Sequence, residues 1–219
     1  MPIPESPIKV LIADDQAMIR AGLAMILAAE DDIEVVGEAV DGVHAVELAG
    51  RLAPDVVLMD IRMPKMDGLQ ALRRLTRPGQ AAGPKVVVVT TFDNDEYVYQ
   101  ALRGGAYGFL LKDSGSALLV EAVRAAAAGE ALVSPAITVK LLRQLSSPSA
   151  KPPSADLSAR ELDVVRLVAR GLTNTEVAER LFISVGTVKT HLGNVQAKLS
   201  ARNRVEIAMW AWQSGIVDR

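Results

Sequence analysis

The chain has 219 residues, of which 50% are hydrophobic and 23% charged, with a formal net charge of -2 and no cysteine. This length allows one large domain or two small ones. The composition excludes a disordered tail, a disulfide framework and a thiolate zinc site. Because no stretch resembles a signal peptide and no apolar run is long enough to span a membrane, we expect a cytoplasmic protein without a membrane partner.

The small net charge hides two unequal parts. Residues 1–130 hold 12 Lys/Arg and 19 Asp/Glu, a net charge of −7, whereas residues 131–219 hold 12 Lys/Arg and 7 Asp/Glu, a net charge of +5. The stretch Ser146–Asp156 is rich in proline and serine, which favours an extended linker. We therefore predict a first domain over 1–130, a linker region with a helical segment (Ser134–Leu145) over 131–156, and a second domain over 157–219.

The first part alternates apolar runs with helical patterns. The predicted strands are Ile8–Ala13, Glu34–Val36 with Ala39, Asp55–Met59, Lys85–Thr90 and Gly108–Leu111. The predicted helices are Ala17–Ala29, Val43–Leu52, Gly68–Leu75, Glu96–Arg103 and Ser116–Ala128. Near-continuous apolar strands separated by helices predict an α/β fold with a doubly wound parallel sheet covered on both faces. Such sheets bind ligands at the carboxyl ends of their strands.

Polar residues follow four of these strands. Asp14 and Asp15 follow the first strand, Asp60 the third, Thr90 ends the fourth, and Lys112 follows the fifth. With the strand order 2-1-3-4-5, these side chains converge on one crevice. Crowded carboxylates repel one another, and Mg²⁺, which prefers oxygen ligands, relieves that repulsion. One carboxylate could then attack phosphorus while a lysine and a hydroxyl stabilise the phosphoryl oxygens.

Each of these residues also has an ordinary structural explanation. A pair of aspartates after a strand is most often a turn or a helix cap, and a single lysine there is most often a solvated surface group. The placement of all of them at four strand ends favours a functional site. No P-loop and no G-x-G-x-x-G pattern is present, so we do not expect a bound nucleotide.

Four segments carry a family resemblance. ADDQ at 13–16, LMDIRMPKMDG at 58–68, VVTTF at 88–92 and GFLLKD at 108–113 resemble the receiver domain of bacterial response regulators, over about residues 8–130. The resemblance implies a flavodoxin-like (βα)5 fold and transfer of a phosphoryl group from a sensor histidine kinase to Asp60. It also implies that Asp14, Asp15, Asp60 and the backbone carbonyl of Arg62 hold Mg²⁺.

The same resemblance assigns the switch. It implies that Thr90 follows the phosphoryl group, that Phe109 is the switch aromatic and that Lys112 pairs with the phosphate. The alternative for Phe109 is plain core filling. Because phenylalanine has no hydroxyl group, signalling through Phe109 would depend on packing alone.

The second part has the pattern of four helices. Ser158 with Glu161 three residues later is a capping-box pattern that begins the first helix, which ends near Gly171. Thr173 or Asn174 is the expected cap of the second helix, and Ser184 is the expected cap of the third. The predicted second, third and fourth helices are Glu176–Leu181, Val185–Leu199 and Asn203–Gln213, and the third buries a stripe of Val188, Leu192, Val195 and Leu199. Two short helices joined by a tight turn are typical of a helix-turn-helix.

The free face of the third helix carries residue types that contact DNA. They are Thr187, Lys189, Thr190, Asn194 and Lys198, with His191 near the edge. Such residues reach phosphates and base edges, although a solvated helix face has the same composition. His191 also fits a packed or capping role.

Residues 155–215 resemble the LuxR-type domain of NarL/FixJ response regulators, notably in LSARELDVV, NTEVAERL and TVKTHLGNVQAKL. The resemblance implies insertion of Val185–Leu199 into the major groove and dimerisation through the last helix. Lys189 and Thr190 would read bases. The side chains expected to position phosphates are Thr175, Thr187, His191 and Lys198. Residues 154–219 have a net charge of only +2, so we expect binding to depend on dimerisation and on salt.

Together these patterns predict a DNA-binding response regulator of a two-component system. Its expected partners are a cognate sensor histidine kinase, double-stranded promoter DNA, a second copy of the chain and RNA polymerase. We expect no enzymatic activity beyond slow self-dephosphorylation. Two alternatives stay open: a regulator that binds DNA independently of phosphorylation, and a Mg²⁺-dependent phosphatase. The phosphatase would need a general acid or base, and no His or Glu occupies a matching strand end.

Overall fold

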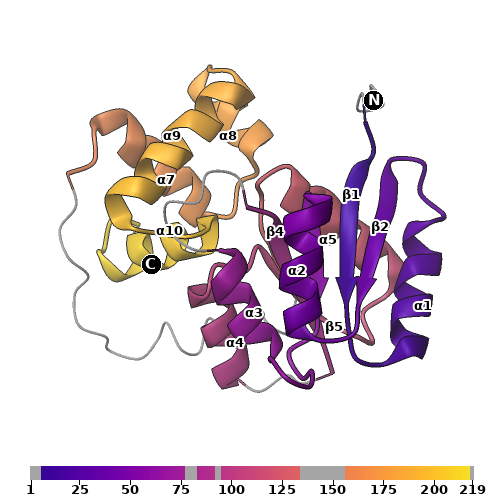
Figure 1. Cartoon of the computed structure of the whole chain (residues 1–219). Helices are drawn as coiled ribbons and strands as arrows, with labels where there is room; N and C mark the ends of the chain where they lie inside the picture. Colours follow the sequence, from indigo (N-terminus) through magenta and orange to yellow (C-terminus); the bar gives the residue numbers. More distant parts are fainter. Residues whose placement is uncertain (1–5, 77–82, 92–94, 134–155, 218–219) are drawn as a thin grey trace. The chain divides into compact units, whose positions relative to one another are not determined.

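The computed structural model describes residues 6–76, 83–91, 95–133 and 156–217 of the chain (Figure 1). The chain divides into two compact units, Met1–Ile137 and Thr138–Arg219. The first is an α/β unit and the second is helical, as the sequence predicts. The predicted helix Ser134–Leu145 and residues 146–155 of the predicted linker lie outside the described residues. Within the described ranges, no helix is both long and apolar enough to cross a membrane.

The α/β unit is built on a parallel sheet with the order β2-β1-β3-β4-β5-β6. This order confirms the predicted five-strand arrangement and adds a short edge strand. The strands are β1 (Ile8–Ala13), β2 (Ile33–Ala39), β3 (Val56–Met59), β4 (Lys85–Thr90), β5 (Gly108–Leu111) and β6 (Leu132–Val133). The winding direction reverses between β1 and β3, and a crevice opens at such a switch point in this fold class.

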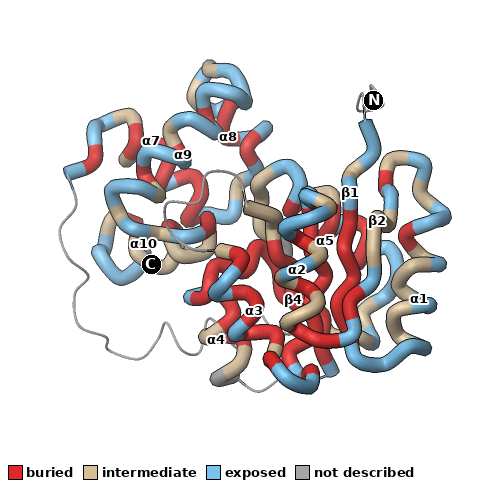
Figure 2. Tube along the Cα trace, viewed as in Figure 1, coloured by how far each residue is buried: buried red, intermediate tan, exposed pale blue. Residues whose placement is uncertain are grey.

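Helices cover both faces of the sheet (Figure 1). They are α1 (Ala17–Leu27), α2 (Gly42–Leu52), α3 (Gly68–Leu75), α4 (Asp95–Arg103) and α5 (Ser116–Ala127). α1 and α5 contact each other and pack on one face, and α2, α3 and α4 lie on the other. Because both faces are covered, β1, β3 and β4 are buried almost throughout (Figure 2), which explains their near-continuous apolar sequences.

Strand alternation assigns the core residues to the two faces. The cluster beneath α1 and α5 contains Val10, Ile12, Leu58, Val87 and Leu110. Successive side chains of a strand point to opposite faces, so Phe109, the neighbour of Leu110, lies on the side of α2, α3 and α4. Phe109 is fully buried there.

Close packing at the start of α3 fixes the turn after β3. The Gly68 amide donates to the carbonyl oxygen of Ile61 at 2.8 Å. A Cβ atom on Gly68 would lie 1.9 Å from the carbonyl oxygen of Asp60, so any side chain there would displace backbone. The carboxylate of Asp67 caps α3 by accepting from the Gln70 amide at 2.7 Å. The helix therefore begins directly against Asp60, the residue that follows β3.

The helical unit contains the four predicted helices. They are α7 (Ala159–Ala169), α8 (Asn174–Leu181), α9 (Val185–Leu199) and α10 (Arg204–Gln213). The capping box of Ser158 and Glu161 is confirmed, and a second box makes Thr173 the cap of α8. Ser184 caps α9, as predicted. Val188, Leu192 and Val195 are buried as predicted, but Leu199, in the last turn of α9, is only partly buried.

Candidate functional site

The carboxyl ends of β1 and β3 bring the three aspartates together. Asp14 and Asp60 are buried and Asp15 is exposed. The Asp60 amide donates to the carbonyl oxygen of Ala13 at 2.9 Å, so the ladder between the two strands fixes this end of both. One carboxylate oxygen of each aspartate lies within 4.8 Å of the others, and the three could together hold a metal ion. The predicted convergence of Asp14, Asp15 and Asp60 is therefore present.

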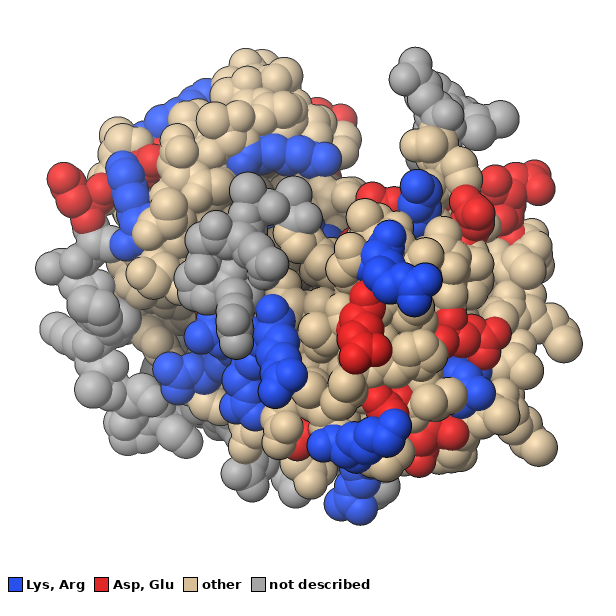
Figure 3. All heavy atoms as spheres, in the orientation of Figure 1, with Lys and Arg blue, Asp and Glu red and all other residues tan. Residues whose placement is uncertain are grey.

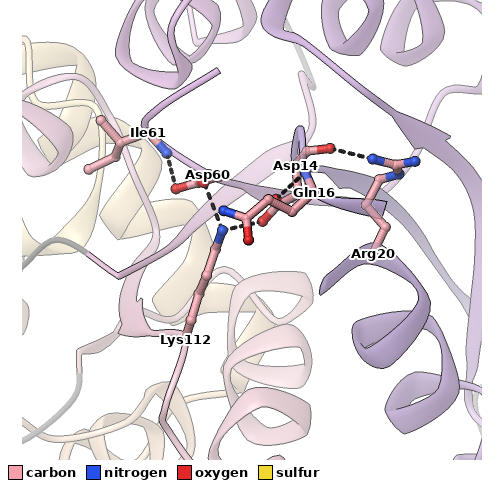
Figure 4. A network of polar contacts seen from close by, with 6 residues as sticks. All are labelled: Asp14, Gln16, Arg20, Asp60, Ile61 and Lys112. Atoms are coloured by element: carbon pink, nitrogen blue, oxygen red, sulfur yellow. Dashed lines mark hydrogen bonds and ion pairs between the residues drawn. The ribbon is translucent and has the colours of Figure 1, made fainter. Parts of the chain in front are cut away.

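Lys112 joins the two buried aspartates (Figure 4). Its ammonium nitrogen lies 2.5 Å from Oδ2 of Asp14 and 2.7 Å from Oδ2 of Asp60, and its side chain is only 6% exposed. Lys112 reaches this position because its amide pairs with the carbonyl oxygen of Thr90 at the end of β4, at 2.9 Å. The ammonium supplies positive charge to carboxylates that would otherwise repel each other.

The remaining carboxylate oxygens accept from backbone amides. Oδ1 of Asp60 accepts from Ile61 at 2.7 Å, and Oδ1 of Asp14 accepts from Gln16 at 2.9 Å. Arg20 holds the same segment from α1 by donating to the carbonyl oxygen of Asp14 at 2.8 Å (Figure 4). Each buried carboxylate is thus oriented from two sides, with oxygens directed toward Lys112.

Burial opposes the charges of this cluster. Burial raises the pKa of Asp14 above its ordinary value, although hydrogen bonds from Lys112 and the Gln16 amide act in the other direction. Burial alone would lower the pKa of Lys112, but its hydrogen bonds to Asp14 and Asp60 outweigh that effect and raise it. Lys112 is therefore cationic at neutral pH. The donor set consists of carboxylate oxygens that ionise at a cost, which fits a hard divalent cation.

A cavity of about 430 Å³ lies beside the acidic cluster. Its lining includes Asp15, Arg62 and Tyr97, together with the turn after β3. Arg62, whose carbonyl is a predicted metal ligand, therefore lines the same cavity as Asp15. The end of the sheet that carries Asp15 therefore borders a cavity.

Thr90 and Phe109 are both fully buried. Thr90 ends β4 next to Leu111 of β5, and Phe109 pairs in register with Val88 one strand over. The structure thus places the two predicted switch residues on neighbouring strands. Their switching role stays a prediction.

The surface charge of the α/β unit is mixed on the face in view. Figure 3 shows Lys and Arg side chains next to Asp and Glu side chains, without one continuous field of a single sign. The buried carboxylates Asp14 and Asp60 instead form a local concentration of negative charge.

The predicted DNA-reading residues lie mostly on the solvent side of α9. Thr187, Lys189, Thr190 and Asn194 are exposed, and His191 is half-buried. Thr190 donates to the carbonyl oxygen of Gly186 at 3.1 Å, and the hydroxyl oxygens of Thr187 and Ser184 lie 2.9 Å apart. Thr175, also exposed, stands in the first turn of α8. The helix therefore presents one polar face, as the periodicity predicts.

Lys198 is exposed on α9 as predicted and has a further partner within the helical unit. Its ammonium nitrogen lies 2.7 Å from Oε2 of Glu161, which is buried in the first turn of α7. The same Glu161 oxygen accepts from the Ser158 amide at 2.7 Å. Lys198 therefore connects α9 to α7 in this structure, and a phosphate contact would require it to leave Glu161. Helical periodicity identifies the cap but carries no information about this second partner, 37 residues away.

We expect the pair of Glu161 and Lys198 to make the stability of the helical unit depend on pH. The hydrogen bond from Lys198, followed by that from the Ser158 amide, lowers the pKa of Glu161 from 4.5 to about 2. The ionised carboxylate therefore stabilises the fold above pH 4.5, and this stabilisation is lost as the pH falls toward 2. Glu161→Gln should be less stable than the wild type at pH 7, and the difference should shrink across that window.

Urea unfolding followed by tryptophan fluorescence measures this difference, because Trp210 and Trp212 are the two tryptophans of the chain and both lie in α10. Asp163→Asn is the control, since its ion pairs with Arg160 and Arg166 are exposed and contribute little. A stability difference between Glu161→Gln and wild type that stays constant from pH 7 to pH 3 would contradict the expectation.

Comparison with known proteins agrees with both units. Residues 10–124 match the family model of the response regulator receiver domain, and residues 155–211 match that of the luxR family of bacterial regulatory proteins. The transcriptional regulatory protein LiaR of Bacillus subtilis is 42% identical over 212 residues, which cover 96% of this chain and 100% of LiaR.

Two solved structures are also similar to the chain. The response regulator ChrA of a heme-sensing two-component system is 37% identical, with a TM-score of 0.54 over 96% of this chain and 99% of ChrA. A structure of two RcsB dimers bound to two parallel DNAs is 25% identical, with a TM-score of 0.57 over 95% of this chain and 98% of that chain.

Proposed function

Because the chain belongs to the NarL/FixJ family of two-component response regulators, which regulate transcription through a LuxR-type DNA-binding domain, we propose that it is switched by phosphorylation of Asp60. A sensor histidine kinase would donate the phosphoryl group. Phosphorylation would then control dimerisation and the binding of promoter DNA. The observation that carries this proposal is the buried cluster of Asp14, Asp60 and Lys112 beside the exposed Asp15.

The geometry supports an attack by Asp60. A carboxylate oxygen of Asp60 would form a bond to phosphorus while the bond from phosphorus to the donor nitrogen breaks, and the kinase histidine would leave with the electron pair of that bond. Oδ1 of Asp60 is held by the Ile61 amide, and Lys112 lies at Oδ2, where it can transfer its hydrogen bond to a phosphoryl oxygen. Asp14, Asp15, Asp60 and the Arg62 carbonyl would hold Mg²⁺. When bound, Mg²⁺ would neutralise the carboxylates and stabilise the negative charge on the phosphoryl oxygens.

We propose that the signal leaves the site through β4 and β5. Thr90 would move toward the phosphoryl group, and Phe109 would repack against the helices on its face of the sheet. Their burial on neighbouring strands supports a coupled movement, because a close-packed core adopts discrete arrangements instead of deforming continuously. The phosphoryl group would thereby shift a pre-existing equilibrium.

In the helical unit, α9 would enter the major groove with Lys189 and Thr190 toward the bases. Thr175 and Thr187 would contact phosphates, and RNA polymerase would be a further partner at the promoter. A net charge of only +2 over residues 154–219 favours a dimer that reads two half-sites. The similar RcsB chains bind DNA as dimers, which supports this arrangement.

Transfer of radiolabelled phosphate from a small phosphodonor in the presence of Mg²⁺ tests the proposal. We expect the wild type to be labelled and Asp60→Ala to remain unlabelled, because the acceptor oxygen is gone. Asp31→Ala is the control, since Asp31 is an exposed carboxylate outside the cluster. Equal labelling of wild type and Asp60→Ala would exclude Asp60 as the acceptor. An affinity for DNA that does not change on labelling would exclude control by phosphorylation.

A further inference from the structure

The turn between β3 and α3 is fastened to the turn between β2 and α2. The ammonium nitrogen of Lys65 lies 2.7 Å from Oδ2 of Asp41, which precedes α2. Next to this ion pair, the Gly42 amide donates to the carbonyl oxygen of Met66 at 3.1 Å. A Cβ atom on Gly42 would lie 2.4 Å from the same oxygen, so the two turns are in close backbone contact.

Asp41 is a buried carboxylate with both oxygens engaged. It is only 2% exposed, and its Oδ1 accepts from the His44 amide at 2.8 Å, which caps α2. The hydrogen bond from His44, followed by that from Lys65, lowers the pKa of Asp41 below its ordinary value. Loss of the lysine charge would release Oδ2 of Asp41 from the neighbouring turn, while the His44 amide would still hold Oδ1.

Lys65 adopts a backbone conformation that favours glycine. Its φ angle is 60°, in the left-handed region that residues with a Cβ atom rarely adopt. Its side chain is 71% exposed, so the ion pair is partly screened by water and adds little to global stability. The ion pair thus holds Lys65 in a disfavoured backbone conformation while it adds little to global stability. This combination indicates that Lys65 serves to position the turn.

The turn between β3 and α3, here called the acceptor turn, carries Asp60, the proposed phosphoryl acceptor. Asp60 begins it, Arg62 follows two residues later, and the Gly68 amide closes its far end on the Ile61 carbonyl at 2.8 Å. Between these ends, the Met66 amide donates to the carbonyl oxygen of Pro64 at 2.7 Å, and the Met66 carbonyl oxygen accepts from Gly42. A displacement of the tip at Lys65 and Met66 would therefore change how the preceding peptides, including the Arg62 carbonyl, are oriented.

We propose that Asp41 and Lys65 are positioning residues for phosphoryl transfer, which orient the turn carrying Asp60 and the Arg62 carbonyl. This inference rests on the function proposed above. It assigns a role to two residues outside the acidic cluster: Asp41, on the turn between β2 and α2, and Lys65, at the tip of the acceptor turn.

The first test is Mg²⁺ binding to the full chain without a phosphodonor, measured by isothermal titration calorimetry. Lys65→Met keeps the length of the side chain and removes its charge. We expect its Mg²⁺ affinity to fall by about tenfold, the low end of the effect of residues that orient metal ligands. Hydrogen exchange of the amides of residues 61–68 should be faster in the metal-free variant. Lys65→Met should also need a correspondingly higher Mg²⁺ concentration to reach half of its maximal rate of labelling by acetyl phosphate.

Further variants separate positioning from folding. Lys65→Arg should restore Mg²⁺ affinity to within about twofold, because it keeps the charge that pairs with the carboxylate. Lys65→Gly relieves the backbone conformation yet should remain impaired. Asp41→Asn keeps an oxygen for the His44 amide, and its combination with Lys65→Met should be no worse than either change alone. Lys9→Met is the control for loss of an exposed lysine, because Lys9 lies at the end of β1 that is far from Asp14.

Wild-type affinity and exchange in Lys65→Met, or failure of Lys65→Arg to restore them, would overturn the inference. Failure of the wild type to be labelled would instead overturn the proposed function. The two failures are distinguishable because calorimetry and hydrogen exchange require no phosphorylation.

Discussion

Lys112→Met should destabilise the α/β unit by about 3 kcal/mol in metal-free solution, because removal of one partner of a buried ion pair leaves the other charge uncompensated. Asp14 and Asp60 both lose the ammonium group that now contacts them at 2.5 and 2.7 Å. Since the Lys112 side chain is only 6% exposed, water has little access to the carboxylate oxygens that the ammonium group contacts. The two carboxylates would also repel each other more strongly.

Hydrogen exchange followed by mass spectrometry measures this loss separately from the helical unit. The amides of β1, β3 and β4 should exchange faster in Lys112→Met, whereas those of α7 to α10 should exchange as in the wild type. Addition of Mg²⁺ should stabilise the variant more than the wild type, because in the wild type the ammonium and the metal compete for the same oxygens. Strand amides protected as in the wild type without Mg²⁺ would show that the contacts of Lys112 contribute little.

The same variant separates phosphorylation of Asp60 from the change in DNA affinity that follows it. We expect Lys112→Met to be labelled at Asp60 by a phosphodonor, but its affinity for DNA should not rise on labelling. The variant keeps the acceptor oxygen and loses the group that would connect the phosphoryl oxygens to β5. Asp60→Ala differs, since it should be neither labelled nor activated.

The sequence predicted the acidic cluster because its geometry follows from topology alone. Buried parallel strands have nearly continuous apolar sequences, and their carboxyl ends meet at one edge, so Asp14, Asp60 and Lys112 are brought together by any sheet of this order. Local patterns likewise predicted the caps at Ser158 and Ser184, whose partners lie three residues away. β6 was missed because two residues are too short to show a period.

Pairs of distant side chains could not be predicted in the same way. Lys65 and Asp41 are 24 residues apart, and Lys198 and Glu161 are 37 residues apart. Neither pair produces a periodic signal, and each depends on how two turns or helices happen to pack. For Lys198 the periodicity predicts a solvent-facing position but not the pairing with the buried Glu161, and the phosphate contact stays a prediction. An exposed lysine on α9 thus also contributes to the packing of its own domain.

Lys189 offers the clearest test of base reading. It is exposed on α9 next to the exposed Thr190, whereas Lys198 on the same helix is paired with Glu161. A specific base contact contributes about 1–3 kcal/mol, and a dimer makes it twice. If each copy loses about 1.4 kcal/mol, Lys189→Ala should reduce affinity for the preferred site by about 100-fold.

Selection from a random duplex library by the phosphorylated full chain identifies the preferred site directly, whatever the sequence of the operator. The sites that Lys189→Ala selects should no longer show a preferred base at one position of each half-site. Thr187→Ala is the matched comparison, because a phosphate contact should weaken binding to all sequences and leave the selected site unchanged. Lys198→Ala should instead lower the stability of the helical unit through Glu161. An unaltered base preference in Lys189→Ala would place this lysine on the phosphate backbone.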